Sequence, residues 1–521
     1  MSIRDLKLAT AIHHIPQYHA HKRPEQLCVI DINNQAITYG ALWSQITQCS
    51  QYLQQQGVQA GDRVLIVGEN CLDMITLYFA CSQLHAWPVA INARLSPREI
   101  EVIRSHALPR VSIYTSRISA TAAKHAQTLF APEIDLPFLP HSGHASTHPP
   151  SSAPCSASLP AAQQVAALIY TSGTTGAPKG VMVPHRGLLH FARISGQSRG
   201  LCPHDRAYAA LPLSHIFGLA TVMLSTLYAG GAIIVRSRFE PAEVRYALTH
   251  LGLTTLQGVP MMFSRLLTEA AAHGAYDAPH LRYIYTGGAA LDRTLKHQVE
   301  ELFQLPLHHG YGITEYAGSL FLTSQEHPAT DCTAGYAVAD LEVHIGCLEQ
   351  PPLPPGIVGD IHVRGPGLML GYYKDPQQTA ETILAGGWLK TGDLGYLCAT
   401  GALYITGRSK EVIIRSGFNV YPQEIETVLN SHPNIRSSAV IGVPASEGNE
   451  HIIAFYQPAS LPFIEQSALD AFLRTQLAPY KIPAQYFAMD SFPTTLSGKI
   501  QKRILRDHYL ATCLSQQANA Q

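Results

Sequence analysis

A loop rich in small hydroxylated residues constrains the fold of this chain more than any other feature. Residues 170–180 read YTSGTTGAPKG, between the apolar runs VAALIY and VMVPH. Its glycines allow positive φ angles and close backbone approach, and its hydroxyls and Lys179 can meet phosphate oxygens. It is not a Walker A loop, because Pro178 stands where that motif needs glycine and Gly180 where it needs serine or threonine. The segment predicts a phosphate-binding loop that follows a strand.

The rest of the chain alternates between helical and strand-like patterns. GDRVLIVGEN reads as a buried strand, and SPREIEVIRSH reads as a helix with a serine N-cap. Such alternation favours an α/β fold with largely parallel sheets. A smaller α+β pattern begins at Lys410. We therefore expect a large N-terminal domain of α/β subdomains at 1–409 and a smaller, mobile α+β C-terminal domain at 410–521.

Two segments need separate interpretation. Residues 131–164 are rich in proline, serine, alanine and histidine, and predict a flexible surface linker. Residues 216–235 are uncharged and mostly apolar, as a membrane span would be. Because Gly230-Gly231 divides this stretch, a buried helix, a turn and a buried strand are the favoured interpretation.

Composition limits the class of protein. The 521 residues have a formal net charge of −1, which gives no electrostatic case for nucleic-acid binding. Ten cysteines are scattered without a CxxC pair, which favours reduced thiols over a zinc site. The N-terminus lacks the apolar core of a signal peptide. A cytoplasmic protein with no transmembrane segment is expected, with peripheral membrane association left open.

Six further motifs occur in order after the loop. They are LPLSHIFG (211–218), YTGGAAL (285–291), HGYGITE (309–315), LKTGDLG (389–395), ITGRSKE (405–411) and LSGKIQKRILR (496–506). With the loop, this series resembles the adenylate-forming superfamily of acyl-CoA synthetases, luciferases and peptide-synthetase adenylation domains. The resemblance covers nearly the whole chain and is closest in motif style to bacterial fatty-acyl-CoA synthetases.

The resemblance implies ATP, Mg²⁺ and coenzyme A as co-substrates and cofactor. A carboxylate that attacks the α-phosphate must overcome repulsion between two anions, so the site needs cations and fixed donors. By resemblance, Lys499 bridges the α-phosphate and the carboxylate. Glu315 and the Thr175 hydroxyl hold Mg²⁺, and His215 gates the site.

The resemblance also assigns the nucleotide contacts. Tyr311 is expected to stack on adenine, Asp393 to accept hydrogen bonds from both ribose hydroxyls, and Arg408 to contact ribose or phosphate. The full set expected to bind ATP or AMP is Thr171, Ser172, Gly173, Thr174, Thr175, Lys179, Gly288, Ala289, Tyr311, Gly312, Thr314, Asp393 and Arg408.

Three further groups follow from the resemblance. Lys410 matches the hinge about which the small domain rotates between the two half-reactions. The coenzyme A tunnel is expected to pass Ser416, Gly417 and Phe418. The acyl pocket is expected to be lined by Phe217, Gly288, Gly312, Gly318 and Ser319.

The acid itself is the least constrained part of the prediction. None of the expected acyl-pocket residues is charged, so a second carboxylate would be buried without a partner. Small residues predict depth, and a medium- or long-chain fatty acid is expected. An aromatic acid is the alternative substrate, and a separate acyl carrier protein is the alternative acceptor. A luciferase-like oxygenase shares the adenylation step and stays open.

Overall fold

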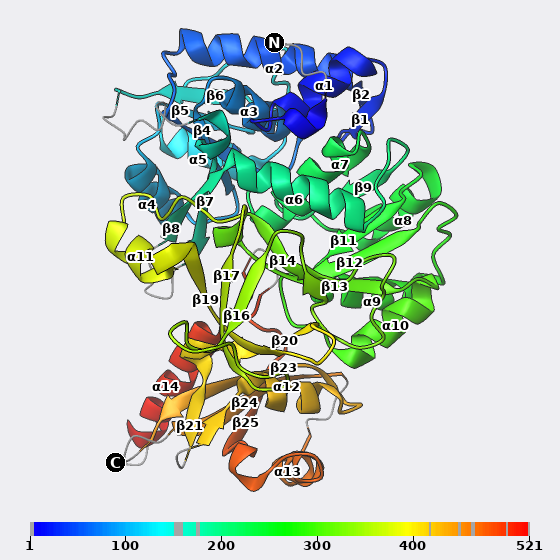
Figure 1. Cartoon of the computed structure of the whole chain (residues 1–521), viewed down its shortest axis with the longest axis vertical. Coiled ribbons are helices and arrows are strands. Elements are labelled where there is room, and N and C mark those ends of the chain that lie inside the picture. The colour runs from blue at the N-terminus through cyan, green and yellow to red at the C-terminus, as the bar shows by residue number, and fades with distance from the viewer. Residues whose placement is uncertain are drawn as a thin grey trace.

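The computed structural model describes residues 5–150, 160–172, 178–415, 418–445, 450–459, 464–495 and 499–518. A large α/β domain forms the N-terminal part, and a smaller α+β domain, orange to red in Figure 1, lies at one end of it. This division agrees with the predicted fold class. The predicted boundary at 409/410 stays a prediction.

The largest sheet has the strand order β15-β14-β13-β12-β11-β9-β10-β1-β2. Its central strands β1, β10, β9, β11, β12 and β13 are parallel neighbours. The strand bounds are β1 (Leu27–Ile30), β2 (Ala36–Thr38), β9 (Arg206–Ala209), β10 (Ala232–Val235), β11 (Thr255–Gly258), β12 (Tyr283–Gly287), β13 (Leu307–Ile313), β14 (Gly318–Leu322) and β15 (Tyr336–Ala337).

Three smaller groups of strands complete the large domain. One sheet has the order β4-β3-β5-β6, an antiparallel pair joins β7 to β8, and another sheet has the order β16-β17-β19-β18 with β20 paired to β19. The bounds are β3 (Arg63–Gly68), β4 (Trp87–Asn92), β5 (Val111–Tyr114), β6 (His144–Thr147), β7 (Val165–Ser172), β8 (Pro178–Pro184), β16 (Glu342–Ile345), β17 (Gly359–Arg364), β18 (Ile383–Leu384), β19 (Trp388–Leu397) and β20 (Leu403–Arg408). Strands β7 and β8 flank the glycine-rich loop, so the predicted strand before it is present.

Helices cover the sheets of the large domain (Figure 1). They are α1 (His14–Lys22), α2 (Tyr39–Gln55), α3 (Leu72–Gln83), α4 (Pro97–Ala107), α5 (Ala120–Thr128), α6 (His185–Ser198), the π-helix η4 (Phe217–Leu224), α7 (Ser225–Tyr228), α8 (Pro241–His250), α9 (Pro260–His273), α10 (Arg293–Phe303) and α11 (Pro376–Thr382). The predicted cap of α4 is confirmed, because the Ser96 side chain accepts from the Glu99 N–H in a capping box.

The apolar stretch at 216–235 is buried inside the large domain. It forms η4, α7, a turn and the fully buried strand β10, as the interruption by two glycines predicted. Of the helices that the structure describes, none has the length and apolar character needed to cross a membrane.

The small domain packs helices against a three-stranded sheet. Its elements are β21 (Ile413–Arg415), β22 (Phe418–Val420), α12 (Pro422–Asn430), β23 (Ile435–Pro444), β24 (Glu450–Pro458), α13 (Gln466–Arg474), β25 (Gln485–Ala488) and α14 (Lys502–Ala518). Its core includes Ile425, Val440, Ile452 and Leu469, all fully buried. The short helix η7 (Ser409–Glu411) connects it to β20.

The prediction of a flexible linker is wrong for residues 131–150. Residues 144–147 form β6, which pairs antiparallel with β5. His141 is buried, its Nδ1 lies 2.9 Å from Asp73 Oδ1, and Ser142 donates to Asp73 Oδ2 at 2.7 Å. The buried Asp73 carboxylate needs polar partners, and this segment supplies them. Residues 151–159 of the predicted linker lie outside the described residues.

Candidate active site

Predicted site residues gather at one edge of the largest sheet. The parallel strands β9, β11, β12 and β13 all point their carboxyl ends toward this edge. His215, Val259, Gly288 and Glu315 follow these four strands in turn. In α/β sheets, ligands bind beyond the carboxyl ends of the strands. The edge is therefore the expected place for a substrate.

A hydrogen-bonded cluster joins this edge to the neighbouring sheet. Tyr311, on β13, donates its hydroxyl to Asp393 Oδ2 at 2.5 Å, and Arg408 Nε lies 3.1 Å from Asp393 Oδ1. Asp393 on β19 and Arg408 on β20 are opposite each other in register. The structure thus brings Tyr311 together with Asp393 and Arg408, which lie 82 and 97 positions later in the chain.

Burial, followed by the Asp393 charge, raises the pKa of Tyr311 well above its usual value. Tyr311 therefore stays a neutral hydroxyl that donates to Asp393. The Asp393 side chain is 6% exposed, and that of Arg408 is 43% exposed. A buried carboxylate with one guanidinium and one hydroxyl as partners is a suitable acceptor for the hydroxyls of a ribose.

Lys499 of the small domain faces the same cluster. Burial by surrounding protein and then the Arg408 charge lower the pKa of Lys499 to about 8, whereas Glu411 and Asp393 act in the opposite direction. The Lys499 residue as a whole is nonetheless exposed to solvent. His215 is the other neighbour: burial, and then Lys499, lower the pKa of His215 to about 4, so its imidazole is neutral at pH 7. This arrangement fits the first half-reaction.

The pKa of Lys499 predicts a pH dependence for adenylation. The protonated ammonium is the form that offsets phosphate charge, so kcat/KM for ATP should fall above about pH 8. In a plot of log(kcat/KM) against pH, the descending limb should have a slope of −1. His215 should add no step between pH 6 and 9. The test is pyrophosphate release measured from pH 6 to 10. Lys499→Arg, which stays charged, should lack the descending limb, and a wild-type profile flat to pH 9.5 would contradict the assignment.

Glu315, the predicted magnesium ligand, lies in η5 (Thr314–Tyr316) directly after β13. Its Oε1 accepts a hydrogen bond from the Tyr372 hydroxyl at 2.9 Å. Thr314 is buried beside it. The predicted partner Thr175 lies outside the described residues, as do Gly173 and Thr174 and the side chain of Ser172. The Thr175–Glu315 magnesium pair therefore stays a prediction.

Lys179 and Thr171 lie on the two strands that flank the glycine-rich loop, and they are paired in register. Lys179 Nζ donates to Gln378 Oε1 at 2.7 Å and lies 5.3 Å from the centre of the Tyr372 ring. The same tyrosine therefore contacts both Lys179 and Glu315. The sequence motifs did not include Tyr372, although it stands next to Tyr373 in the segment GYYKDP (371–376).

Aromatic side chains wall the predicted acyl pocket. The Phe217 and Tyr285 rings lie edge to face with centroids 5.9 Å apart. A Cβ at Gly288 would lie 3.7 Å from Phe217 Cδ1 and 3.6 Å from Val259. Tyr285 Oη lies 3.4 Å from Ser319 Oγ in the buried interior. Tyr285 belongs to the YTGG motif, but the motif did not indicate its contacts with Phe217 and Ser319.

Two of the predicted pocket glycines lie where a side chain would meet neighbouring atoms. A Cβ at Gly312 would lie 2.4 Å from the Gly318 carbonyl oxygen, and a Cβ at Gly318 would lie 2.6 Å from the Phe191 ring. These glycines allow β13, β14 and α6 to pack closely in the direction of the missing side chain, while Gly312 itself is exposed. Their place in an acyl pocket stays a prediction. Ala289 is half-buried next to Gly288.

The predicted coenzyme A loop is only partly described. Ser416 and Gly417 lie outside the described residues. Phe418 is 53% exposed and stacks on Tyr480 with ring centroids 4.5 Å apart. Lys410, the predicted hinge, lies in η7, where the Ser409 hydroxyl donates to Asp360 Oδ1 at 2.9 Å. The hinge role stays a prediction.

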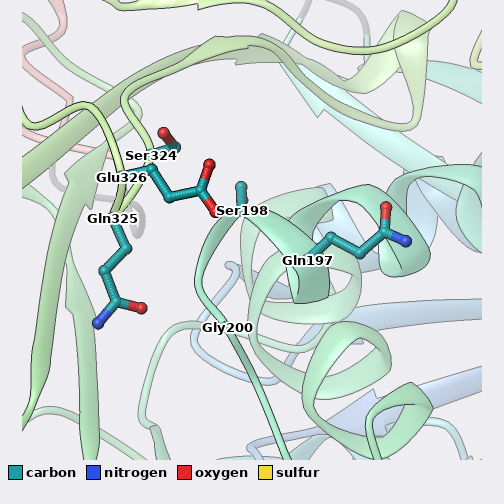
Figure 2. A pocket seen from close by; sticks show the side chains of 6 residues that line it. All are labelled: Gln197, Ser198, Gly200, Ser324, Gln325 and Glu326. Atoms are coloured by element: carbon teal, nitrogen blue, oxygen red, sulfur yellow. The ribbon is translucent and has the colours of Figure 1, made fainter.

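A surface cavity of about 370 Å³ lies apart from these residues. Figure 2 shows its lining, which comes from the end of α6 and the segment after β14: Gln197, Ser198, Gly200, Ser324, Gln325 and Glu326. Among these six described residues there is one carboxylate and no cation. The lining does not suit a phosphate ligand.

The residues gathered at the sheet edge are those expected of a ligase that acts on a carboxylate through a nucleotide. Family comparison agrees with this expectation. The description "AMP-binding enzyme" matches residues 16–373, and "AMP-binding enzyme C-terminal domain" matches residues 424–499. The chain belongs to the AMP-binding enzyme family of the adenylate-forming superfamily, and it is an acid–thiol ligase.

Two curated relatives and one solved structure are similar to this chain over most of its length. A feruloyl-CoA synthase from Amycolatopsis sp is 34% identical over 91% of this chain and 94% of its own length. A fatty acid–[acyl-carrier-protein] ligase, ScoC of Streptomyces coeruleorubidus, is 31% identical over 94% of this chain and 95% of its own. The solved o-succinylbenzoate coenzyme A synthetase of Bacillus subtilis, in complex with ATP and magnesium ion, is 27% identical, covers 93% of this chain and 98% of its own, and has a TM-score of 0.78.

Proposed function

We propose that the enzyme couples a carboxylic acid to coenzyme A in two steps that use ATP. The acid's carboxylate oxygen attacks the α-phosphorus, the bond to the β-phosphate breaks, and pyrophosphate leaves. The coenzyme A thiolate then attacks the acyl carbonyl, and AMP leaves. The observation that carries this proposal is the cluster of Tyr311, Asp393, Arg408 and Lys499 at the sheet edge.

Each residue of the cluster has a distinct role in the first step. Asp393 orients the ribose, and Arg408 lies where it can reach the ribose or the phosphates. Lys499 offsets the charge that the carboxylate and the α-phosphate bring together. His215 is neutral, and its Nδ1 accepts the Phe217 N–H at 3.2 Å, which turns the other ring nitrogen into a donor.

Glu315 is suited to be a magnesium ligand. The residue is half-buried beside β8, one of the two strands that flank the glycine-rich loop, and its Oε1 accepts a hydrogen bond from the Tyr372 hydroxyl. Glu315, together with the predicted Thr175 hydroxyl, would hold Mg²⁺, which would neutralise part of the polyphosphate charge.

The walls of the acyl pocket favour an aromatic acid of the cinnamate or benzoate type. Phe217 and Tyr285 present ring edges and faces, and a flat substrate ring gains from such packing beyond its buried area. The buried hydroxyls of Tyr285 and Ser319 provide polar contacts for a ring substituent. The similarity to a feruloyl-CoA synthase supports the same class.

A medium- or long-chain fatty acid is the second candidate. The π-helix η4 supplies a continuous apolar wall, with Leu219, Ala220 and Val222 fully buried. The similarity to a fatty acid–[acyl-carrier-protein] ligase supports both this acid class and a carrier protein as acceptor.

A panel of acids distinguishes these candidates. Ferulate, cinnamate, benzoate, octanoate and decanoate are each assayed for AMP release with coenzyme A, with an acyl carrier protein, and with neither thiol. We expect kcat/KM for the best aromatic acid to exceed that for octanoate by about tenfold or more, because each aromatic pair contributes roughly 1 kcal/mol beyond area burial. Coenzyme A should be the better acceptor.

Phe217→Leu tests whether the phenyl ring of Phe217 causes the preference for aromatic acids, because leucine keeps an apolar side chain but has no ring. This variant should lose several-fold more kcat/KM with cinnamate than with octanoate. Tyr246→Leu, at an exposed aromatic residue of α8, is the matched control. A wild-type kcat/KM that rises steadily with aliphatic chain length, and exceeds all aromatic acids, would establish the fatty-acid alternative instead.

A further inference from the structure

A second cavity lies beside the end of the glycine-rich loop. Its volume is about 430 Å³, and its lining comes from α4, β8, α11 and the segment at 372–375. Figure 1 shows α4, β8 and α11 together on one side of the large domain. Two lysines line this cavity, Lys179 and Lys374. Lys179 was expected at the phosphates, whereas no motif included Lys374.

Backbone contacts place the segment at 372–375 against β8. Val181 bridges Tyr372 in antiparallel fashion, and the Tyr373 N–H donates to the Gly180 carbonyl at 2.7 Å. The chain then turns, because Tyr372 also bridges Asp375, and Lys374 lies inside this turn with a φ of 56°. Lys179 and Lys374 therefore line the same cavity from two adjoining segments. An anion bound between them would reduce the repulsion between their charges.

Both ammonium groups have only neutral partners among the described residues. Lys179 donates to the Gln378 amide oxygen, and Lys374 donates to the His106 carbonyl at 2.8 Å. Each also lies over a tyrosine ring, Lys179 over Tyr372 and Lys374 over Tyr373 at 5.0 Å. Within the described part of the chain, no carboxylate oxygen lies within 4 Å of either nitrogen, so both cations can bind an incoming anion.

The cavity lining also contains two carboxylates, which limit the kind of ligand that can bind there. Asp375 Oδ1 accepts the Gln378 backbone N–H at 2.9 Å, and Glu381 Oε1 accepts from the Gln377 side chain at 3.1 Å. Two anions in the lining disfavour a bare polyanion and favour one that carries a divalent cation. Magnesium pyrophosphate is such a ligand, and adenylation produces it at the adjoining loop.

We propose that this cavity receives magnesium pyrophosphate after it separates from AMP, with Lys179 shared between the loop and the cavity and Lys374 binding only the released product. The proposal rests on the proposed function, because pyrophosphate arises there only if the enzyme adenylates its acid. No bond forms or breaks in this step. Binding the product in the cavity clears the nucleotide site for the small domain to rotate.

Lys374→Gln tests the proposal through ATP–pyrophosphate exchange and product inhibition. We expect the KM for pyrophosphate in exchange, and its inhibition constant in the forward reaction, to rise about tenfold, since a charge-assisted contact is lost. The KM for ATP should change less than twofold. Lys374→Arg should keep nearly wild-type values, and Lys124→Gln, at an exposed lysine of α5, is the control for loss of one charge. Thermal melting checks that each variant is folded.

Two results would overturn the proposal. One is an unchanged pyrophosphate KM in folded Lys374→Gln. The other is an equal rise in the KM values for pyrophosphate and ATP, which would place Lys374 at the phosphates of bound ATP. A wild-type enzyme that shows no exchange with any acid would contradict the proposed function. Calorimetric titration of wild-type and Lys374→Gln enzyme with magnesium pyrophosphate would still test the cavity directly.

Discussion

Lys499→Ala is expected to lower the rate of acyl-adenylate formation by a factor of about 10² or more, equivalent to about 3 kcal/mol of transition-state stabilisation. The charges of Arg408 and Asp393 act on the Lys499 ammonium, which in turn acts on His215. In the proposed mechanism, loss of this side chain removes a cation from the point where the carboxylate and the α-phosphate meet. Thioester formation from a supplied acyl-adenylate should stay within about threefold of wild type, because the proposed rotation of the small domain would move Lys499 away from the site.

The two half-reactions are measured separately, by ATP–pyrophosphate exchange and by thioester formation from purified acyl-adenylate. Arg503→Ala is the matched control, since Arg503 is an exposed cation on α14 close in sequence. It should leave both half-reactions unchanged. Equal loss of both half-reactions in a folded Lys499→Ala enzyme would rule out the assigned role.

Asp393→Ala is expected to raise the KM for ATP by about ten- to a hundredfold, which corresponds to roughly 1.5–3 kcal/mol for hydrogen bonds to a charged acceptor. The substitution removes the proposed ribose acceptor. It also leaves Arg408 and the Tyr311 hydroxyl without their shared partner. The rate at saturating ATP should fall less than the affinity, because Asp393 does not touch the reacting phosphorus in the proposed arrangement.

Nucleotide affinity is read from the KM for ATP and, independently, from titration with AMP. Asp340→Ala serves as the control, because Asp340 is a largely exposed carboxylate of the same domain. A further comparison uses 2′-deoxy-ATP and ATP. Wild type should discriminate between them, and Asp393→Ala should not. Retained discrimination together with wild-type ATP affinity would remove Asp393 from the nucleotide site.

The sequence motifs identified three residues that the structure brings together at the sheet edge. HGYGITE, TGDLG and ITGR contain Tyr311, Asp393 and Arg408, and these side chains meet in the structure. Turn glycines and chemically distinctive side chains leave a local signature, so motifs of this kind can be found without knowledge of packing. The cap of α4 and the buried segment at 216–235 were predictable for the same reason.

Composition predicted a linker at residues 131–150, and the structure differs. Proline, serine and histidine there are typical of a linker, but His141 and Ser142 pair with the buried Asp73. The partner lies almost seventy residues earlier in the chain, and no local pattern indicates it. Similarly, no local pattern indicates that a Cβ at Gly312 would meet the Gly318 carbonyl oxygen, or that a Cβ at Gly318 would meet the Phe191 ring.

The sequence by itself determined the α/β class, the order of the phosphate, nucleotide and lysine motifs, and membership of a family of acid–thiol ligases. Each of these depends on local periodicity or on residues close together in the chain. Only the tertiary structure decided that the Tyr285 ring packs against Phe217, that Tyr372 contacts both Lys179 and Glu315, and that Lys374 and Lys179 line one cavity. The physical reason is that strand register and packing distances depend on the whole fold. They involve segments far apart in the chain, and the local sequence of one segment does not indicate which other segment it will contact.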